Sequence, residues 1–229
     1  MPKTWLPLEA NPEILTAYSR KLGLPEGLCF HDVMSVESWA IEMIPQPVQA
    51  ILLLFPISPA SELERETTSP SRIPDVFYMN QTIGNACGTI AVLHTLANLI
   101  VGGGCEFDRE SYVSRFLGST QSLTASERGV WLENDSEIEK AHVAVESLGQ
   151  TVAPGAEAEV DTHFIAFVLA ADGKTVVELD GRRSGPIIRG VVDSGSDFGL
   201  TVLDVIKREF MDRNPEDIRF SILALAPAE

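Results

Sequence analysis

Residues 80–98 read NQTIGNACGTIAVLHTLAN and lead from a polar, glycine-containing segment into a long apolar run. The apolar residues follow helical spacing until three consecutive glycines, so we predict a helix over about 85–100. With Asn85 as its cap, Cys87 falls in the first turn, where unpaired N–H groups and the helix dipole lower the pKa of a thiol. Small neighbours on both sides leave room for a substrate carbonyl. Cys87 is therefore a candidate nucleophile, and the alternative is a small buried apolar residue.

Helices and strands are predicted on both sides of this stretch. Helical patterns cover 11–23, 106–118, 124–148 and 198–213. Short apolar runs bounded by turn residues predict strands at 48–55, 163–170, 175–181, 185–192 and 218–226. Residues 58–75 are rich in Ser, Thr, Pro and charge and are typical of a surface loop, and 149–162 are typical of a long exposed connection. Helices mixed with antiparallel strands, with no break in composition, favour a single α/β domain over residues 1–229.

The charge of the chain limits its partners. Thirty-three acidic residues face seventeen basic ones, which gives a formal net charge of −16. Such a field repels nucleic acid and anionic membranes and attracts basic partners. The alternative is that the acidic excess only keeps the protein soluble.

The cysteines and the first residues indicate the compartment. An odd number of cysteines, three in 229 residues, favours free thiols in a reducing compartment over a disulfide framework. The first ten residues have no apolar signal core, and the longest apolar run, 48–57, is too short to span a bilayer. We therefore expect a cytoplasmic protein, with the nucleus as a second location. No zinc-binding spacing and no phosphate-binding glycine loop is present in the sequence, so no metal and no cofactor is expected.

A cysteine nucleophile needs an imidazole to take its proton, and the chain has four histidines. His94 lies on the same predicted helix as Cys87, about 10 Å along its axis, and is expected to pack on the helix face. His31 falls in a short strand as a satisfied surface residue, and His142 on an amphipathic helix among exposed charges. His163 begins a strand directly after the long connection, at an edge where strands deliver catalytic side chains. His163 is the preferred general acid/base.

The imidazole needs a partner for its second nitrogen, and an amide substrate needs donors for the oxyanion. Asp172-Gly173 predicts a hairpin whose outer ends bring Asp180 to His163. Asp180 is thus the candidate orienter, and its alternative reading is a turn residue before a glycine. Gln81, six residues before Cys87, could donate to the oxyanion together with the Cys87 N–H. The set Gln81, Cys87, His163 and Asp180 carries more weight than any member alone.

Three segments around these residues, QTIGNACGTIAVLH, DTHFIAFVL and ELDGRRSGPI, resemble the active-site segments of the ubiquitin carboxyl-terminal hydrolases. These are papain-like cysteine deubiquitinases, and the resemblance spans nearly the whole chain and is closest to the short, single-domain members. It implies the same four catalytic roles. It also implies a central, mostly antiparallel sheet flanked by helices, a knotted backbone, and a crossover loop at about 149–162. Such a loop admits small or unfolded leaving groups.

By the same resemblance, the substrate is a conjugate of ubiquitin, whose basic tail ends in two glycines and suits an acidic, narrow cleft. Pro7, Leu8 and Phe164 are implied ubiquitin contacts, with ordinary packing as the alternative for each. The implied reaction is hydrolysis of an amide, ester or thioester bond through an acyl-enzyme, by a monomer. Two other functions remain open: a module that binds or stores ubiquitin with little turnover, and a hydrolase of a related modifier. A general peptidase is the least favoured.

Overall fold

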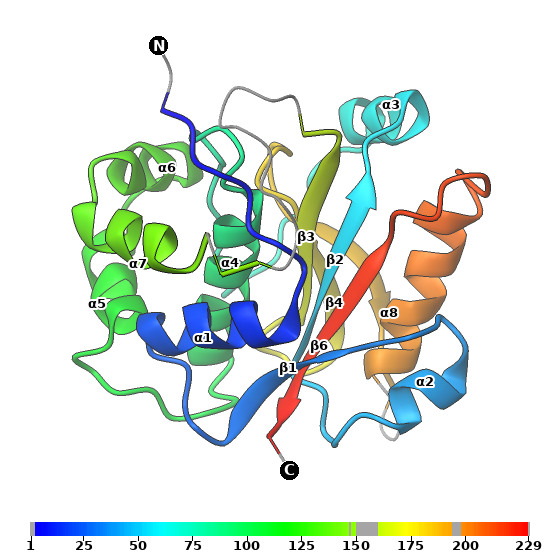
Figure 1. The fold of residues 1–229 in the computed structure, drawn as a ribbon, viewed down its shortest axis with the longest axis horizontal. Helices are drawn as coiled ribbons and strands as arrows, with labels where there is room; N and C mark the ends of the chain where they lie inside the picture. Colours follow the sequence, from blue (N-terminus) through cyan, green and yellow to red (C-terminus); the bar gives the residue numbers. More distant parts are fainter. Residues whose placement is uncertain (1–2, 147, 150–159, 194–197, 229) are drawn as a thin grey trace.

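The computed structural model describes residues 3–146, 148–149, 160–193 and 198–228. Its centre is a six-stranded sheet in the order β1-β6-β2-β3-β4-β5, in which all neighbouring strands run antiparallel (Figure 1). The strands are β1 (Leu28–Asp32), β2 (Ala50–Pro56), β3 (Thr162–Leu169), β4 (Thr175–Leu179), β5 (Ile187–Val191) and β6 (Ser221–Pro227). The expected α/β fold with a mostly antiparallel central sheet is confirmed.

The central strand β2 is buried on both of its faces. Ala50 and Leu52 belong to one apolar cluster, and Ile51 and Leu53 belong to a second one. Because side chains alternate along a strand, the two clusters lie on opposite sides of the sheet. Leu52 and Leu53 are both fully buried, and burial of each side chain contributes roughly 2 kcal/mol to the stability of the fold. An uninterrupted apolar run is what a strand covered on both faces requires.

Helices cover both faces of the sheet (Figure 1). Against the first cluster lie α1 (Pro12–Leu22), α4 (Cys87–Val101), α5 (Tyr112–Thr120), α6 (Ala125–Glu133) and α7 (Ser136–Glu146). Against the second lie α2 (Ser38–Glu42) and α8 (Phe198–Ile206), which continues as a π-helical turn, η1 (Lys207–Met211). A short helix, α3 (Pro59–Thr67), follows β2. Every residue of α4 from its start to Leu99 is buried, so this helix lies in the middle of the first layer.

One expectation about the helices is wrong. Residues 58–75 are not wholly a loop, because α3 begins at a capping box in which Ser58 and Ser61 bond to each other's backbone N–H. No residue of α3 is buried, so no apolar periodicity indicates this helix. The helical pattern at 124–148 is confirmed, as two helices, α6 and α7, that meet between Glu133 and Ser136.

Other local expectations are confirmed. The Asn11 side chain accepts from the N–H groups at the start of α1, and Gly23 ends that helix with a left-handed φ of 114°. β3 and β4 form the expected antiparallel hairpin. Residues 150–159, most of the expected crossover loop, lie outside the described residues. None of the helices in the described ranges is long and apolar enough to cross a membrane.

Candidate active site

The Cys87 thiol lies at the first residue of α4, at the edge of the core. Ala86 is the cap of this helix, and Asn85, which the sequence suggested as the cap, instead takes a left-handed φ of 58°. Asparagine tolerates this conformation better than most residues, and it turns the chain sharply into the helix. Cys87 is 7% exposed, so the residue is largely buried. The position in the first helical turn is as predicted.

Several groups stabilise the charged form of this thiol. Burial alone raises the pKa of Cys87, but a hydrogen bond and the charge of His163 oppose it, as do the backbone N–H groups of Phe164 and Gly88. The net result is a pKa below the ordinary thiol value. The structure therefore brings Cys87 and His163 together, although they are far apart in the sequence.

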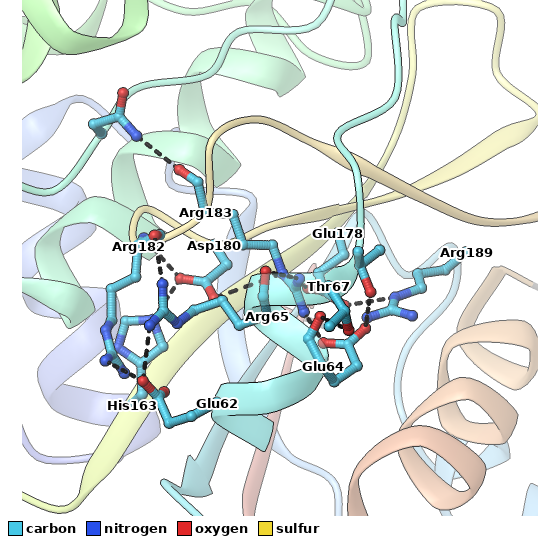
Figure 2. A network of polar contacts seen from close by, with 12 residues as sticks. Glu62, Glu64, Arg65, Thr67, His163, Glu178, Asp180, Arg182, Arg183 and Arg189 are labelled. Atoms are coloured by element: carbon cyan, nitrogen blue, oxygen red, sulfur yellow. Dashed lines mark hydrogen bonds and ion pairs between the residues drawn. The ribbon is translucent and has the colours of Figure 1, made fainter. Parts of the chain in front are cut away.

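His163 is also bonded to Asp180. Its Nε2 lies 2.6 Å from Asp180 Oδ1, and both side chains are about 4% exposed (Figure 2). Since Nε2 donates to the carboxylate, Nδ1 is the nitrogen left for the thiol. The aromatic ring of Phe55 packs edge-on against the imidazole at a centroid distance of 5.9 Å. The imidazole therefore lies between the carboxylate, to which it is hydrogen-bonded, and the thiol, whose pKa it lowers.

Cys87, His163 and Asp180 each stabilise the charged form of their neighbour. Burial lowers the pKa of His163, but Asp180 and the Cys87 thiolate outweigh it and raise the pKa to about 9. Burial raises the pKa of Asp180, but His163, the Arg182 N–H and Arg183 lower it to about 2. The same contacts therefore favour the charged form of each of the three groups: thiolate, imidazolium and carboxylate.

The turn that carries Asp180 is fixed from the segment before α4. The Tyr78 hydroxyl lies 2.7 Å from the Asp180 carbonyl oxygen and 2.6 Å from that of Arg183. The Asn80 side chain also donates to the Arg183 carbonyl, at 2.8 Å. A Cβ on Gly181 would lie 3.2 Å from the Gln81 nitrogen, so only glycine permits this approach. Sequence analysis missed Tyr78 and Asn80, because nothing in their spacing marks a contact a hundred residues away.

Gln81 lies beside this turn. Its backbone N–H donates to the Gly181 carbonyl at 2.8 Å, and its side-chain Nε2 donates to the Ile83 carbonyl at 3.1 Å. A primary amide has two N–H groups, so one remains for another acceptor. The same Gly181 would bring a Cβ within 2.8 Å of Ile90, one helical turn after Cys87. Gln81 thus lies close to the start of α4, and its role as an oxyanion donor stays a prediction.

Leu8 and Phe164 pack where the helix begins. A Cβ on Gly88 would lie 3.2 Å from Leu8 and 3.4 Å from Phe164, so the three residues are closely packed at this point. Leu8 is 5% exposed and Phe164 3% exposed, whereas Pro7 is half-buried. The N-terminal segment therefore covers the helix next to Cys87. Contact of these three residues with a substrate stays a prediction.

The other histidines have structural partners. His94 is buried and stacks on Tyr78, and its Nε2 lies 3.1 Å from the Met79 N–H nitrogen, from which it accepts a hydrogen bond, so the expectation that it packs is confirmed. His31 lies in β1, where its Nε2 is 2.9 Å from the Pro227 carbonyl.

The expectation that His142 lies among exposed charges is wrong. Its side chain is fully buried, its Nδ1 lies 2.9 Å from the Thr89 hydroxyl, and its Nε2 lies 2.8 Å from the Leu6 carbonyl. Burial lowers the pKa of both His94 and His142 to about 4, so neither carries charge near neutral pH.

All three cysteines are free thiols. The Sγ of Cys29 lies 3.2 Å from His31 Nε2, but that nitrogen is also bonded to a backbone carbonyl, and no carboxylate in the described part of the chain pairs with this imidazole. Burial and the neighbouring Glu106 raise the pKa of Cys105. Among the described residues, no group of three or more His, Cys, Asp or Glu side chains is placed to hold a metal ion.

The preassembled pair predicts an unusual pH dependence for Cys87 alkylation by iodoacetamide. We expect a first rise below the ordinary thiol pKa of 9, where the thiolate–imidazolium pair forms, and a second rise near pH 9, where His163 loses its proton. The measurement is the alkylation rate of Cys87, followed by peptide mapping from pH 4 to 10. Cys105 in the same sample is the internal control. A single rise at the ordinary value or above would show that the pair does not form.

The chain is similar in sequence to known proteins over nearly its whole length. The sequence profile described as "Ubiquitin carboxyl-terminal hydrolase, family 1" matches residues 5–212. A ubiquitin carboxyl-terminal hydrolase of Drosophila melanogaster is 41% identical over 233 residues, which cover 99% of each chain. Ubiquitin carboxyl-terminal hydrolase 3 of Arabidopsis thaliana is 39% identical and covers 98% of this chain and 94% of its own. Isozyme L1 of Rattus norvegicus is 36% identical, with 97% and 98% covered.

A solved structure shares the fold. The catalytic domain of Trichinella spiralis UCH37, bound to ubiquitin vinyl methyl ester, superimposes with a TM-score of 0.79 over 98% of this chain and 96% of that one. Its sequence identity of 24% supports a common fold alone. The family assignment comes from the profile match and from the closer relatives. This chain therefore belongs to family 1 of the ubiquitin carboxyl-terminal hydrolases, and it is a thiol-dependent hydrolase.

Proposed function

We propose that this chain hydrolyses the bond that follows the C-terminal glycine of ubiquitin, with Cys87 as nucleophile, His163 as general acid/base and Asp180 as the orienter of His163. One observation carries the proposal. The thiol at the start of α4 lies close enough to the His163 imidazole for its pKa to be lowered, and Nε2 of that imidazole lies 2.6 Å from a buried carboxylate. This is the arrangement that a cysteine nucleophile and its base require.

In the first half of the cycle, the Cys87 thiolate attacks the carbonyl carbon of the last glycine, and the carbonyl electrons move onto oxygen. The Cys87 N–H, one of the N–H groups that a helix start leaves without an intrahelical acceptor, donates to that oxyanion together with Gln81. The tetrahedral intermediate then expels the leaving group, which takes the proton held by His163. An acyl-enzyme thioester remains.

In the second half, His163 acts as a base. Its neutral Nδ1 takes a proton from a water molecule, and the hydroxide attacks the thioester carbonyl. Collapse of this intermediate releases the ubiquitin carboxylate and returns the Cys87 thiolate beside the imidazolium. Asp180 stays charged throughout, because the surroundings lower its pKa to about 2. The carboxylate thus stabilises the imidazolium in both halves.

The substrate side of the proposal is supported by charge and by size. The chain carries a net charge of −16, which suits a tail with arginines before its terminal glycines. Leu8 and Phe164 pack against Gly88 beside the nucleophile, so the surroundings of the thiol at this point are apolar. We expect a tail of two consecutive glycines, which have no side chains, to reach the thiol more easily than bulkier residues would.

The test uses ubiquitin whose C-terminus carries a thiol-reactive group. Equimolar reaction with the purified protein is expected to give one covalent adduct, and peptide mapping is expected to locate it on Cys87. An adduct on Cys29 or Cys105 would refute the assigned site. Absence of any adduct, with tight binding of ubiquitin, would favour a module that only binds or stores it.

Substrate choice is measured in parallel. Conjugates of ubiquitin and of a related modifier, each with the same fluorescent leaving group, are compared at equal concentration, with unfolded casein as a third substrate. We expect the ubiquitin conjugate to be cleaved with the highest kcat/KM. A preference for the other modifier would replace ubiquitin as the substrate, and digestion of casein would indicate a general peptidase.

A further inference from the structure

Four charged side chains, two buried and two partly buried, lie on the side of Asp180 that faces away from His163 (Figure 2). This cluster consists of Glu64 of α3, Glu178 of β4, Arg183 of the turn after β4, and Arg189 of β5. Their side chains are 18%, 1%, 5% and 11% exposed, respectively. Two arginines and two glutamates balance in charge, and each arginine contacts both glutamates, which is the condition under which such groups are tolerated in an interior.

Within this cluster, two carboxylates hold Arg183. Its Nε donates to Glu178 Oε1 at 2.9 Å, and its Nη2 donates to Glu64 Oε2. The same Nε lies 3.8 Å from Asp180 Oδ2, which is beyond hydrogen-bonding distance. Arg183 therefore stands beside the carboxylate of the active site without bonding to it.

Arg183 lies close enough to compete for the carboxylate that is hydrogen-bonded to His163. Asp180 Oδ1 accepts from His163 Nε2 at 2.6 Å and from the Arg182 N–H at 2.8 Å. Arg183 would need to approach by only about 1 Å to bond Oδ2, and a guanidinium pairs strongly with a carboxylate. Such a pair would pull the carboxylate from His163 and neutralise the charge that stabilises the imidazolium.

We propose that Glu64 is a positioning residue that holds Arg183 away from Asp180, so that the Asp180 carboxylate stays committed to His163. The inference rests on the proposed role of Asp180 as the orienter of His163. It gives α3, a helix that buries none of its residues, a part in the chemistry. Burial alone would raise the pKa of Glu64, but Arg183 and Arg189 lower it by more than burial raises it. The pKa is therefore below its ordinary value, and this carboxylate stays charged at neutral pH.

A purely structural role for the cluster is the alternative. In that case Glu64 only ties α3 to the body of the protein, through Arg183 and through Arg189, whose Nη2 lies 3.0 Å from Glu64 Oε1. The two roles make opposite predictions for the loss of a second charged residue. If Arg183 competes with His163 for the Asp180 carboxylate, removing Arg183 restores the rate that is lost when Glu64 is removed. If Arg183 only links α3 to the sheet, removing it lowers the rate further.

The experiment compares Glu64→Ala, Arg183→Met and the double variant, with Glu66→Ala as the matched control. Glu66 lies on the same helix, its side chain is 67% exposed, and its one ion-pair partner among the residues that the structure describes is Arg65, at 4.0 Å. Turnover of the fluorogenic ubiquitin conjugate gives kcat and KM. The alkylation rate of Cys87 at pH 6 reports the thiolate–imidazolium pair without any ubiquitin, and thermal unfolding shows that each variant is folded.

We expect Glu64→Ala to lower kcat about tenfold with little change in KM, and to slow alkylation at pH 6, whereas Glu66→Ala changes neither. The double variant is expected to regain the rates of Arg183→Met. A double variant as slow as Glu64→Ala, or slower, would overturn the proposal, as would a Glu64→Ala variant that equals its control. If turnover is absent in the wild type, the proposed function fails, and the alkylation rates still decide the role of Glu64.

Discussion

Replacing Cys87 with alanine is expected to reduce turnover of a fluorogenic ubiquitin conjugate by at least about 10⁴-fold, to the level that binding and oxyanion donors alone support. The nucleophile has no substitute in the site, because His163 is committed to Asp180 at 2.6 Å and no second thiol contacts that pair in the described structure. The fold should survive the change, since alanine removes one buried sulfur and suits the first turn of a helix.

Two measurements separate the loss of chemistry from the loss of structure. Calorimetric titration with ubiquitin is expected to give the same affinity for Cys87→Ala as for the wild type. The matched control is Cys29→Ala, which removes a thiol that also lies beside an imidazole but outside the active site, and it should keep normal turnover. Turnover by Cys87→Ala above the background, or its loss in Cys29→Ala, would contradict the assignment.

Much of this site was predictable from the sequence because few residue types can do the chemistry. A thiol in the first turn of a helix has a recognisable context, and the hairpin signal at Asp172-Gly173 brings Asp180 to His163. The structure shows the pair at hydrogen-bonding distance. Local turn chemistry and strand pairing therefore predicted a contact between residues seventeen positions apart.

The parts that sequence analysis missed depend on contacts between distant segments. The pattern around His142 indicates an exposed helix face. In the structure, the ring of Trp5 packs against the imidazole, and the Leu6 carbonyl accepts a hydrogen bond from its Nε2. Trp5 and Leu6 belong to the N-terminal segment, far from His142 in the sequence. Glu64 lies on a helix without a buried face, so periodicity gives no reason to expect it near the Asp180 carboxylate. In both cases the partner, and not the residue itself, determines the burial.

Replacing His163 with glutamine is expected to lower kcat by about 10⁴-fold, because the step loses both the base that forms the thiolate and the acid that protonates the leaving group. The thiol itself should also change. Burial raises the pKa of Cys87, and His163 is the main group that opposes it, so without the imidazole only the N–H groups of Phe164 and Gly88 remain. Alkylation of Cys87 near pH 6 should therefore become slow, and its midpoint should move upward.

The double variant Cys87→Ala/His163→Gln shows whether the two residues act as one unit. If each contributed separately, the two losses would multiply, and the double variant would be far slower than either single one. Because the thiolate and the imidazolium are one ion pair, removing either partner removes what the other does. We therefore expect the double variant to retain the same residual turnover as Cys87→Ala, within about threefold. A multiplicative loss, measured with the same conjugate, would mean that His163 acts on the substrate without acting through Cys87.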